Sequence, residues 1–507
     1  MNATKELNDM DTKSFIALRH FTSLRDFLDA LRDLGDMREV SREVDTDLEI
    51  GAIIRRTHET YAPAPLFKNI RGHRGYRVVG APLSYSSLPG AKMARVALAL
   101  GLDPRAHPLD IIETLTRSIK NPPVPPIVVD KGLCQENVMI GDDADLMKFP
   151  TPLIHARDGG RYFNTLGFWV VRSPDGKWTN WSIARAMLLD SKRMTGVIAP
   201  YQHNGMIYNM WRERGEPMPF ALVQGAEPAA LFVGGMPLAE GVDEAGYLGG
   251  LFGEPLELVR CKTVDLQVPA TAEIIVEGHV SIDEVAQEGP MGEYHGYLRD
   301  EKYHFPVYHV SAITHRNDPI LPVTSAGKSV EEDHTAAGVP FSAVCLQRLR
   351  DEGLPVTSAW SVPEAAEHML AVSISRDWPT HTELSADELS RRIAAIAKMM
   401  HGGQRITRVM VCDDDIDLGN LRDLMWAWNS RCHPAKGHFV MKDLPANPIE
   451  PMYAAAHLSF DGGRTPLGPI DVLNCLLDPK ATNLHISDFA SNYPEEIKER
   501  VLAHWDD

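Results

Sequence analysis

The sequence pattern of the chain changes twice, and these changes constrain the fold more than any single motif. Helical patterns dominate the first part, but from about Gln135 to Ile320 the chain consists of short runs rich in Val, Ile, Thr and aromatic residues, separated by Gly and Pro. Afterwards helical and strand patterns alternate. Many short strands with turn signals between them are typical of a barrel or a sandwich. Because 507 residues are too many for one core, we expect roughly three folding units.

The first part of the chain combines helices with a strand. The stretch FTSLRDFLDALRDLG has apolar residues at helical spacing; Thr22 or Ser23 can cap its start, and Gly35 can end it. MREVSREVD then alternates as a strand does. A short helical pattern begins near Asp103 and leads into NPPVPP, a stiff stretch that ends at Pro126 and predicts a boundary.

Two later stretches predict specific local structures. TLGFWVVRSPDGKWTNWSIARAM contains a strand, an SPDG turn and a second strand, which is the pattern of a hairpin. In the last third, the strand pattern HMLAVSIS precedes a helix with a Ser385/Glu388 capping box. Gly402 and Gly403 end that helix before the strand ITRVMVC, and another helix starts near Asn420. Such a compact α/β unit late in a chain often serves packing or dimerisation.

The net charge limits the partners. The formal charge is −18 at pH 7, and 44% hydrophobic with 24% charged residues is the composition of an ordinary soluble globular protein. A nucleic-acid or anionic-membrane partner needs a basic surface, so we expect neither. A small anionic ligand is compatible with this charge if positive groups gather locally.

The cysteines and the N-terminus indicate the compartment. The six cysteines are scattered without a C-x-x-C pair, which predicts reduced, mostly buried thiols and neither a disulfide frame nor a zinc site. The polar start MNATKELNDMDTK lacks the apolar core of a signal peptide, and no apolar run approaches the roughly 18 residues of a membrane span. We therefore expect a cytoplasmic protein without a transmembrane helix.

The stretch QEGPMGEYHGY, residues 287–297, places two carboxylates close together. Pro290 lacks a backbone donor and glycines flank it, so we expect a shaped loop or bulge and no regular element. Polar turns are usually solvated, and on its own the stretch favours a surface loop. The alternative is that Glu288 and Glu293 meet in one site, where repulsion raises the pKa of one and a nearby cation keeps the other ionised.

Partners for these carboxylates are found in other stretches. Arg185 in NWSIAR is the candidate cation, although a lone arginine is more often a surface or salt-bridge residue. Asn180, His203 in APYQHNG and Glu244 in MPLAEGVDEAGY offer an amide oxygen, an imidazole nitrogen and a carboxylate, a set suited to Mn²⁺ or Mg²⁺. Their spacing matches no local metal motif, so each of them alone is more often structural.

Together these stretches resemble the UbiD family of reversible decarboxylases, which use prenylated FMN. The resemblance runs over nearly the whole chain, from APAPLFKNI through TNWSIARAM, PYQHNG, MPLAEGVDEAGY and VPATAEIIVEGHVS to EGPMGEYHGY and DDDIDLGNLRDLMWAWNSRC. It is closest to the ferulate/phenylacrylate decarboxylase branch. The resemblance implies a reversible, non-oxidative decarboxylation of an aromatic, heteroaromatic or α,β-unsaturated carboxylic acid through a covalent adduct with prenylated FMN.

The resemblance also implies a mixed α+β architecture. An N-terminal α/β segment (about residues 1–126) and a split β-barrel like that of flavin reductases (about 127–320) would form the cofactor domain, residues 1–320. An α/β oligomerisation domain (321–450) and a C-terminal helical tail (451–507) would follow. We expect a homodimer or a higher homo-oligomer, and a partner flavin prenyltransferase that supplies the cofactor.

Cofactor and metal ligands carry over from the family by position. Asn180, His203 and Glu244 match ligands of Mn²⁺ that tie the metal to the cofactor phosphate. Positions that match a nearby K⁺ site are Trp181, Val233, Gly234, Met236 and Glu244. Positions that match the cofactor cradle are Asn180, Trp181, Ser182, Ile183, Ala184, Arg185, Gln202, His203, Glu244 and His401, the last in place of a lysine that contacts the phosphate. Bound cations would let a chain of charge −18 hold a phosphorylated flavin without a basic patch.

Arg185, Glu288 and Glu293 match the family's Arg/Glu/Glu network beside the flavin. The resemblance implies that Arg185 pairs with the substrate carboxylate or with Glu288, and that it keeps Glu288 ionised. A like-charged neighbour and a site that excludes water would favour the protonated form of Glu293. Glu293 would then give its proton to the carbon that loses CO₂. The cofactor would serve as the electron sink.

Six positions match the family's substrate pocket: Thr165, Tyr294, Asp333, Ala337, Asn447 and Ile449. Tyr294 stands where cinnamate-type enzymes often have Met, and Asp333 replaces a small hydroxyl residue. A buried Asp needs a hydrogen-bond donor, which a ring N–H or a phenolic O–H would supply. We therefore predict a heteroaromatic or hydroxylated aromatic acid, such as a pyrrole- or indole-carboxylate, ahead of a simple acrylic acid.

Two other functions stay open: a decarboxylase that uses Mn²⁺ without flavin, and a non-catalytic flavin-binding protein. A colourless protein that is active with Mn²⁺ alone would support the first. The second is disfavoured because a mere binder has no need of Arg185, Glu288 and Glu293 together.

Overall fold

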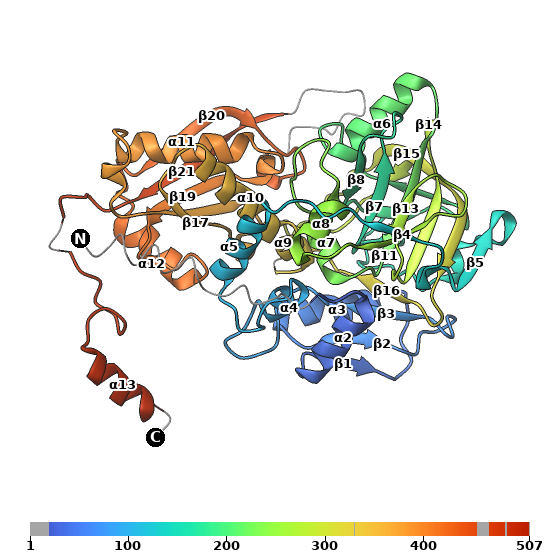
Figure 1. Ribbon diagram of the computed structural model, residues 1–507, viewed down its shortest axis with the longest axis horizontal. Coiled ribbons are helices and arrows are strands. Elements are labelled where there is room, and N and C mark those ends of the chain that lie inside the picture. The colour runs from blue at the N-terminus through green and yellow to red at the C-terminus, as the bar shows by residue number, and fades with distance from the viewer. Residues whose placement is uncertain (1–19, 329, 454–465, 482–483, 506–507) are drawn as a thin grey trace.

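The computed structural model describes residues 20–328, 330–453, 466–481 and 484–505. Within these residues the strands form four sheets, of four, nine, three and five strands. Figure 1 shows the N-terminal elements (blue) below the largest sheet (green and yellow), and the five-stranded sheet with its helices (orange) beside it. The fold is therefore mixed α and β. The polar start MNATKELNDMDTK, where we expect no signal peptide, lies outside the described residues.

A small mixed sheet organises the N-terminal elements. Its strands, in order, are β1 (Met37–Val40), β2 (Ala64–Phe67), β3 (Arg77–Gly80) and β16 (Ile320–Val323). The helices beside it are α2 (Leu24–Asp33), α3 (Glu49–Thr60) and α4 (Ala94–Ala99). The predicted first helix is α2: the Ser23 hydroxyl accepts a hydrogen bond from the Asp26 amide (3.2 Å), and Gly35 follows with φ +73°. Because β16 pairs with β3, the chain returns to this sheet after the strand-rich stretch.

The helix expected after Asp103 is α5 (Pro108–Ser118), which packs against C-terminal elements. It contacts α10 (Gly338–Asp351) and β17 (Val356–Ser361). Arg350 donates to Glu113 Oε2 at 2.9 Å, which adds an ion pair to this contact. The first part of the chain therefore also stabilises the last part.

The nine-stranded sheet is curled by two irregularities in its longest strands. Its order is β6-β9-β10-β15-β14-β11-β7-β8, with β5 paired to β15. The strands are β5 (Asn137–Ile140), β6 (Tyr162–Asn164), β7 (Gly167–Arg172), β8 (Thr179–Ser182), β9 (Ala186–Leu188), β10 (Arg193–Gly196), β11 (Met218–Gln224), β14 (Ile274–Glu288) and β15 (Tyr303–His315). Register shifts at Glu277/Gly278 and Val280/Val285 interrupt the β14–β15 pairing, and such bulges increase the local twist. Gly278 is required at the first shift, since a Cβ there would lie 1.8 Å from the His309 carbonyl oxygen.

The predicted hairpin is present at one end of this sheet, where β7 and β8 pair antiparallel. In its SPDG turn the Gly176 amide donates to the Ser173 carbonyl at 2.9 Å, and Gly176 has φ +74°. Three helices pack on β8: α6 (His203–Arg214), α7 (Pro228–Gly234) and α8 (Glu244–Phe252). A three-stranded sheet beside them consists of β13 (Gln267–Pro269), β12 (Glu257–Arg260) and β4 (Ile127–Val129).

Two apolar cores stabilise this arrangement. One fills the inside of the curled sheet, where the rings of Trp169, Phe220 and Tyr308 pack with centroids 4.6 to 5.3 Å apart. The other runs from α2 and α5 across α7 and α8 to the five-stranded sheet. Since the second core is continuous between the units, it fixes how the C-terminal unit sits against the curled sheet.

The C-terminal unit is built on a sheet of order β17-β18-β19-β21-β20. Its further elements are β18 (Met369–Ile374), β19 (Arg408–Asp413), β20 (His438–Pro445), α9 (Glu332–Ala336), α11 (Ala386–Met399) and α12 (Leu421–Arg431). Helix α11 begins with the predicted capping box: Ser385 Oγ accepts from the Glu388 amide, and the Glu388 carboxylate accepts from the Ser385 amide (2.8 Å). Helix α12 begins next to Asn420, as expected, and Asn420 caps it by accepting from the Arg422 amide at 3.1 Å.

The expected helical tail over residues 451–507 is wrong in part. Its described residues include β21 (Leu467–Cys475), which lies between β19 and β20 and completes the sheet. The sequence LGPIDVLNC alternates as a strand does, and it buries Ile470 and Val472. Helix α13 (Glu495–Ala503) does lie in the expected tail, and Figure 1 shows it well away from the sheets.

Two general predictions are confirmed. All six cysteines are free thiols, and Cys134, Cys345, Cys412 and Cys475 are buried. Among the described residues no helix is long and apolar enough to cross a membrane.

Candidate active site

A cavity of about 270 Å³ lies where the curled sheet meets α7, α9 and the C-terminal unit. Most of the predicted site residues line it: Thr165, Asn180, Trp181, Ser182, Ile183, Ala184, Arg185, Gln202, His203, Gly234, Met236, Glu293, Tyr294, Asp333, Ala337, His401, Asn447 and Ile449. The other three, Glu288, Glu244 and Val233, are buried and do not line the cavity. These lining residues are spread over about 280 residues of sequence, from Thr165 to Ile449, and the fold brings them together.

The two carboxylates of QEGPMGEYHGY come from different local structures. Glu288 is the last residue of β14, so the start of this stretch is strand and not loop, contrary to our expectation. The loop begins at Gly289, whose φ of +80° suits glycine. Glu293 lies within the loop, where its amide donates to the Tyr297 carbonyl at 3.0 Å.

Arg185 joins both carboxylates, as the Arg/Glu/Glu network predicts. Its Nε donates to Glu288 Oε1 at 2.7 Å and its Nη2 to Glu288 Oε2 at 3.0 Å, a two-pronged contact. Its Nη1 donates to Glu293 Oε1. The Glu288 side chain is fully buried, whereas those of Arg185 and Glu293 are each 15% exposed toward the cavity.

The charges of the triad support one another. Burial lowers the pKa of Arg185, but the charges of Glu293 and Glu288 outweigh burial and raise that pKa well above its ordinary value. The Tyr162 hydroxyl also donates to Glu288 Oε1, at 2.8 Å. Burial raises the pKa of Tyr162 far above its usual range, so this hydroxyl stays a donor. Glu288 is therefore held on both oxygens, whereas within the described part of the chain the Glu293 carboxylate is hydrogen-bonded to Arg185 alone.

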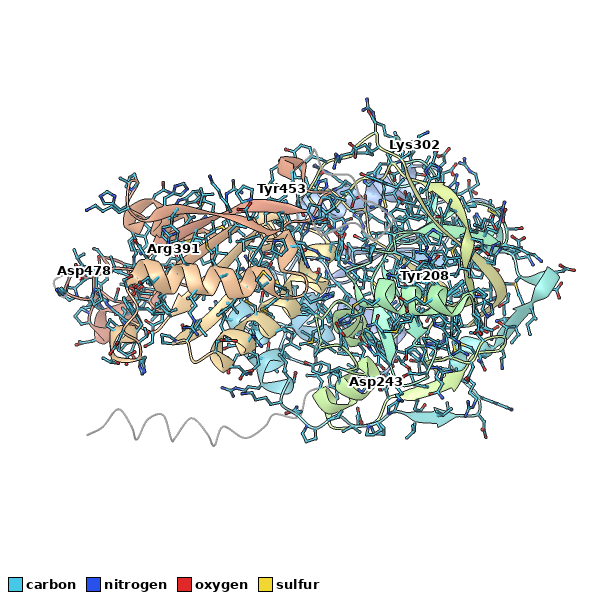
Figure 2. The ribbon with its side chains drawn as sticks, turned by 90° about the horizontal axis from the view of Figure 1, so that it is seen from above. Tyr208, Asp243, Lys302, Arg391, Tyr453 and Asp478 are labelled. Atoms are coloured by element: carbon cyan, nitrogen blue, oxygen red, sulfur yellow. The ribbon has the colours of Figure 1, made fainter. Side chains whose placement is uncertain are left out.

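The predicted manganese ligands come from the starts of two helices and from an edge strand. Asn180 lies on β8, and His203 and Glu244 are the first residues of α6 and α8. Asp243, labelled in Figure 2, caps α8 by accepting from the Gly246 amide at 3.0 Å, which sets Glu244 in the first turn. Asn180 Nδ2 donates to Glu244 Oε1 at 2.6 Å, so two of the three groups are in contact.

Several oxygen atoms on this wall have no partner. Asn180 Oδ1, Glu244 Oε2 and Ser182 Oγ are buried and accept or donate no hydrogen bond among the described residues. Burial raises the pKa of Glu244 to about 8, which reflects the lack of a nearby positive charge. Buried polar atoms usually have partners, and unpaired oxygens suit a hard cation. The residues present therefore fit a cation at this wall.

The expected metal ligands include few ionisable side chains. Among the described residues no group of three or more His, Cys, Asp or Glu side chains could hold a metal ion; the expected manganese set has two such residues and Asn180. In the expected potassium set, a Cβ on Gly234 would lie 3.9 Å from Trp181 Cβ, so these two residues are adjacent. Val233 lies on α7 beside Gly234, and Met236 follows shortly after the end of this helix.

The cofactor cradle is formed largely by one segment. Residues 180–185 line the cavity without interruption and Gln202 lies beside His203. The His203 and His401 rings stack with their centroids 4.6 Å apart, so His401 lies at the wall that carries His203. Burial lowers the pKa of His401 to about 4, which makes it a neutral group here. Lys398, one turn earlier, does not line the cavity, and its Nζ donates to the Gln404 carbonyl at 3.0 Å.

All six predicted substrate-pocket residues line the cavity, but they differ in how their polar atoms are used. Thr165 Oγ1 accepts from the Thr324 amide at 3.1 Å, and Asn447 Nδ2 donates to the Tyr294 hydroxyl at 3.1 Å. The Asp333 carboxyl has no hydrogen-bond partner among the described residues. Burial, with the nearby Glu367 charge, raises the pKa of Asp333 to about 7. Asp333 is thus the group that a bound donor would satisfy.

Sequence reasoning missed several residues of the site. Tyr162 supports Glu288 from 126 positions away. Arg405 lines the cavity and pairs with Glu367 at 2.6 Å. Glu450 is fully buried and bonds the Tyr294 hydroxyl. No local pattern signals these contacts, because each joins distant parts of the chain.

An ion triad beside a cavity with unpaired buried oxygens is the arrangement of an enzyme site. Residues 28–115, 127–329 and 334–465 match the UbiD profiles described as the N-terminal, Rift-related and C-terminal domains of 3-octaprenyl-4-hydroxybenzoate carboxy-lyase. The chain therefore belongs to the UbiD family, as its motifs predict, and it is a carboxy-lyase.

Two relatives match the chain over nearly its whole length. Pyrrole-2-carboxylic acid decarboxylase of Pseudomonas aeruginosa is 41% identical, covering 96% of this chain and 98% of that protein. Ferulic acid decarboxylase 1 of Saccharomyces cerevisiae is 33% identical, covering 95% and 97%.

Solved structures of the UbiD-class enzyme HmfF from Pelotomaculum thermopropionicum are also similar, at 26% identity. The complex with FMN superposes with a TM-score of 0.78, covering 95% of this chain and 100% of that one. An evolved dimeric form in complex with prFMN gives 0.75, covering 92% and 97%.

Proposed function

We propose that this carboxy-lyase reversibly and non-oxidatively decarboxylates a heteroaromatic acid that carries a ring N–H, of the pyrrole-2-carboxylate type. The observation that carries the proposal is the Asp333 carboxyl, which lines the same cavity as Arg185 and has no hydrogen-bond partner among the residues that the structure describes. A ring N–H would satisfy it. The relative at 41% identity, whose name states pyrrole-2-carboxylic acid as substrate, supports the same class.

The cofactor set that we propose is prenylated FMN, Mn²⁺ and K⁺. The HmfF complexes with FMN and prFMN support the flavin. Asn180, His203 and Glu244 would hold Mn²⁺, and the unpaired oxygens of two of them support this assignment. When bound, the prenylated flavin would supply the electron sink for the carbon that loses CO₂.

Arg185 would bind the substrate carboxylate. Its contact with Glu288 uses two nitrogens and is backed by Tyr162, whereas its contact with Glu293 uses only Nη1. An incoming carboxylate would therefore displace Glu293 and leave Glu288 in place.

Glu293 would supply the proton. Once displaced from Arg185, its carboxylate would face the substrate carboxylate in a largely buried site, and repulsion would favour uptake of a proton from solvent. It would then deliver that proton to the ring carbon as CO₂ leaves, so that one proton is consumed for each CO₂ released.

The test begins with protein co-expressed with a flavin prenyltransferase. The mass spectrum of the released flavin is measured together with CO₂ release from pyrrole-2-carboxylate, furan-2-carboxylate and cinnamate. Furan-2-carboxylate is the matched control, because it has the ring shape without the N–H. We expect a prenylated FMN mass and the fastest turnover with the pyrrole acid.

The Asp333→Ala variant then tests the carrying observation. It should lose activity on the pyrrole acid far more than on the furan acid or cinnamate. Only the pyrrole acid has a ring N–H that donates to the Asp333 carboxyl, so only this substrate loses a hydrogen bond. Equal losses on all three substrates would contradict the proposal. A folded protein with no flavin that is active with Mn²⁺ alone would instead support the metal-only alternative.

The assembly that we propose is a homodimer or a higher homo-oligomer formed through the C-terminal α/β unit. On α12, Leu421, Met425 and Trp426 are exposed apolar side chains. The HmfF form described as dimeric supports a dimer. Sedimentation equilibrium of the purified protein tests it, and a monomer at micromolar concentration would contradict it.

A further inference from the structure

Glu450 links the C-terminal unit to the loop that carries Glu293. It is fully buried and lies just after the segment of Asn447, on the C-terminal side of the cavity. Its Oε1 accepts from the Tyr294 hydroxyl and from Asn447 Nδ2 (3.2 Å), and its Oε2 contacts His368 Nε2. Both carboxylate oxygens are therefore occupied by protein groups and none is left for a ligand.

Tyr294, the chain neighbour of Glu293, is held at both ends. Its hydroxyl is bonded to Glu450, and its carbonyl accepts from His334 Nε2 at 2.8 Å. The other ring nitrogen of His334 accepts from the Glu331 amide at 3.0 Å, which assigns the proton to Nε2. Burial lowers the pKa of His334 to about 3, in accord with a neutral ring.

Residues 289–298 also have anchors other than Tyr294. The Gly292 amide donates to Asp158 Oδ1 (3.0 Å), the Pro290 carbonyl accepts from the Gly159 amide (2.6 Å), and Arg185 holds the Glu293 carboxylate. Bonds within the loop join the Glu293 amide to the Tyr297 carbonyl (3.0 Å), the Gly296 amide to the Glu293 carbonyl (2.9 Å) and the Tyr297 amide to His295 Nδ1 (3.3 Å). Toward the C-terminal wall, the described hydrogen bonds of residues 289–298 are those of Tyr294, and Arg299 Nη1 adds one to the Pro448 carbonyl at 3.4 Å.

We infer that Glu450 is a positioning residue: through the Tyr294 hydroxyl it sets the loop of Glu293 against the C-terminal wall of the cavity. The consequence for catalysis rests on the proposed function, in which Glu293 is the proton donor. A second consequence concerns specificity. The Tyr294 hydroxyl is used by Glu450 and Asn447, so Tyr294 offers the cavity its ring and no polar group.

The first experiment needs neither cofactor nor substrate. Amide hydrogen exchange of residues 289–298 is measured in the purified wild type and in Tyr294→Phe, Glu450→Ala and Glu450→Gln. Tyr294→Phe removes one hydroxyl and keeps the ring, so it carries the test even if Glu450→Ala does not fold. We expect at least about tenfold faster exchange of the loop amides in Tyr294→Phe and Glu450→Ala. Glu450→Gln keeps an oxygen acceptor of similar volume and should restore most of the protection.

Tyr453→Phe is the matched control. Figure 2 labels Tyr453 near the junction of the C-terminal sheet and the curled sheet, and its hydroxyl donates to the Pro469 carbonyl at 2.5 Å. The Tyr453→Phe substitution removes a tyrosine hydroxyl that lies three residues from Glu450 in the chain. The hydrogen bond lost does not involve the loop of Glu293. Its loop exchange should equal that of the wild type. Unchanged loop exchange in Tyr294→Phe and Glu450→Ala, or the same increase in Tyr453→Phe, would overturn the inference.

The second experiment reads the catalytic consequence in flavin-loaded enzyme. For pyrrole-2-carboxylate we expect Tyr294→Phe to lower kcat about tenfold while KM changes less than about threefold, since a misplaced proton donor slows chemistry more than binding. The double variant Tyr294→Phe/Glu450→Ala should be no slower than Glu450→Ala alone, because both changes break one link. Additive losses would overturn the link. A wild type that releases no CO₂ would refute the proposed function, and the exchange result would still stand.

Discussion

Two walls of the same cavity satisfy their buried polar atoms in opposite ways. On the wall of Arg185 every charged group has a protein partner, and Glu288 is held by both Arg185 and Tyr162. On the wall of Asn180, the atoms Asn180 Oδ1 and Glu244 Oε2 have no partner among the described residues. An unpaired buried polar atom costs about 1–3 kcal/mol. The first wall is thus organised by the protein alone, whereas the second would be completed by the proposed cation.

The largest effect is expected on the paired wall. Arg185→Ala removes the cation from two carboxylates and leaves Glu288 buried without its two-pronged partner. We expect kcat/KM for the pyrrole acid to fall about a thousandfold or more, since both substrate binding and the placing of the proton donor are lost. Steady-state kinetics of flavin-loaded protein measure this loss.

Arg193→Ala is the matched control for Arg185→Ala. Arg193 also pairs with two carboxylates, Asp190 and Glu284, but about half of each side chain is exposed. Its removal should leave kcat/KM within about twofold, because exposed ion pairs contribute little. An Arg185→Ala protein that kept full activity would revive the non-catalytic flavin-binding alternative.

A smaller effect is expected on the unpaired wall. Glu244→Gln keeps the shape of the side chain and its contact with Asn180, but it removes the charge that a cation needs. We expect retention of metal and flavin to weaken at least about 10–100-fold, with the fold intact. Metal analysis and flavin absorbance after gel filtration measure both.

Glu277→Gln is the control for a buried glutamate away from the cavity. Glu277 accepts from the Lys262 amide at 2.8 Å and the Thr263 amide at 2.7 Å, and it does not line the cavity. That variant should keep its metal and flavin content. If Glu244→Gln also kept both, the unpaired oxygens would not mark a cation site, and the contrast between the two walls would fail.

A third effect, about tenfold, is expected in the pH dependence set by Asp333. Burial raises the pKa of Asp333 to about 7, so this carboxyl is neutral below that pH and an ionised acceptor above it. Turnover of the pyrrole acid should therefore rise about tenfold between roughly pH 6 and pH 8, as the ionised fraction does. Asp333→Asn should lose this rise, and furan-2-carboxylate should not show it in either protein.

The same shift predicts the sign of a stability change. The pKa of Asp333 is higher in the folded state than the value of about 4 in the unfolded chain, so the folded state binds its proton more tightly. The free energy of unfolding of the wild type should fall relative to Asp333→Asn as the pH rises from about 4 to 7. Melting curves across this range test it, and a constant difference would show that folding does not raise the pKa of Asp333.

Local structure could be predicted from the sequence, because its causes lie within a few residues. The Ser23 cap, the SPDG turn and the Ser385/Glu388 capping box each depend on neighbours in the chain, and all are present. Strand β21 lies where we expect a helical tail, although its sequence alternates, because that expectation follows the family resemblance and not the local pattern.

The site shows the same limit at longer range. The family motifs led to Arg185, Glu288 and Glu293, and the structure brings these three together. The supports of the triad lay beyond prediction: Tyr162 is 126 residues from Glu288, and Glu450 is 156 residues from Tyr294. Such contacts depend on how the curled sheet and the C-terminal unit pack, and a single sequence carries no local signal for that.

The smallest effect is expected where the chain is far from either wall. Ser385→Ala removes the N-cap of α11, whose residues 385–388 do not line the cavity. Local opening of the helix start should become easier by about 1 kcal/mol, because the Glu388 amide loses its acceptor. Hydrogen exchange of the first turn of α11 measures this. Ser430→Ala, an exposed site inside α12, is the control and should change stability by less than about 0.5 kcal/mol. Neither variant should change kcat/KM; a loss in Ser385→Ala would mean that the site depends on this helix as well as on the two walls.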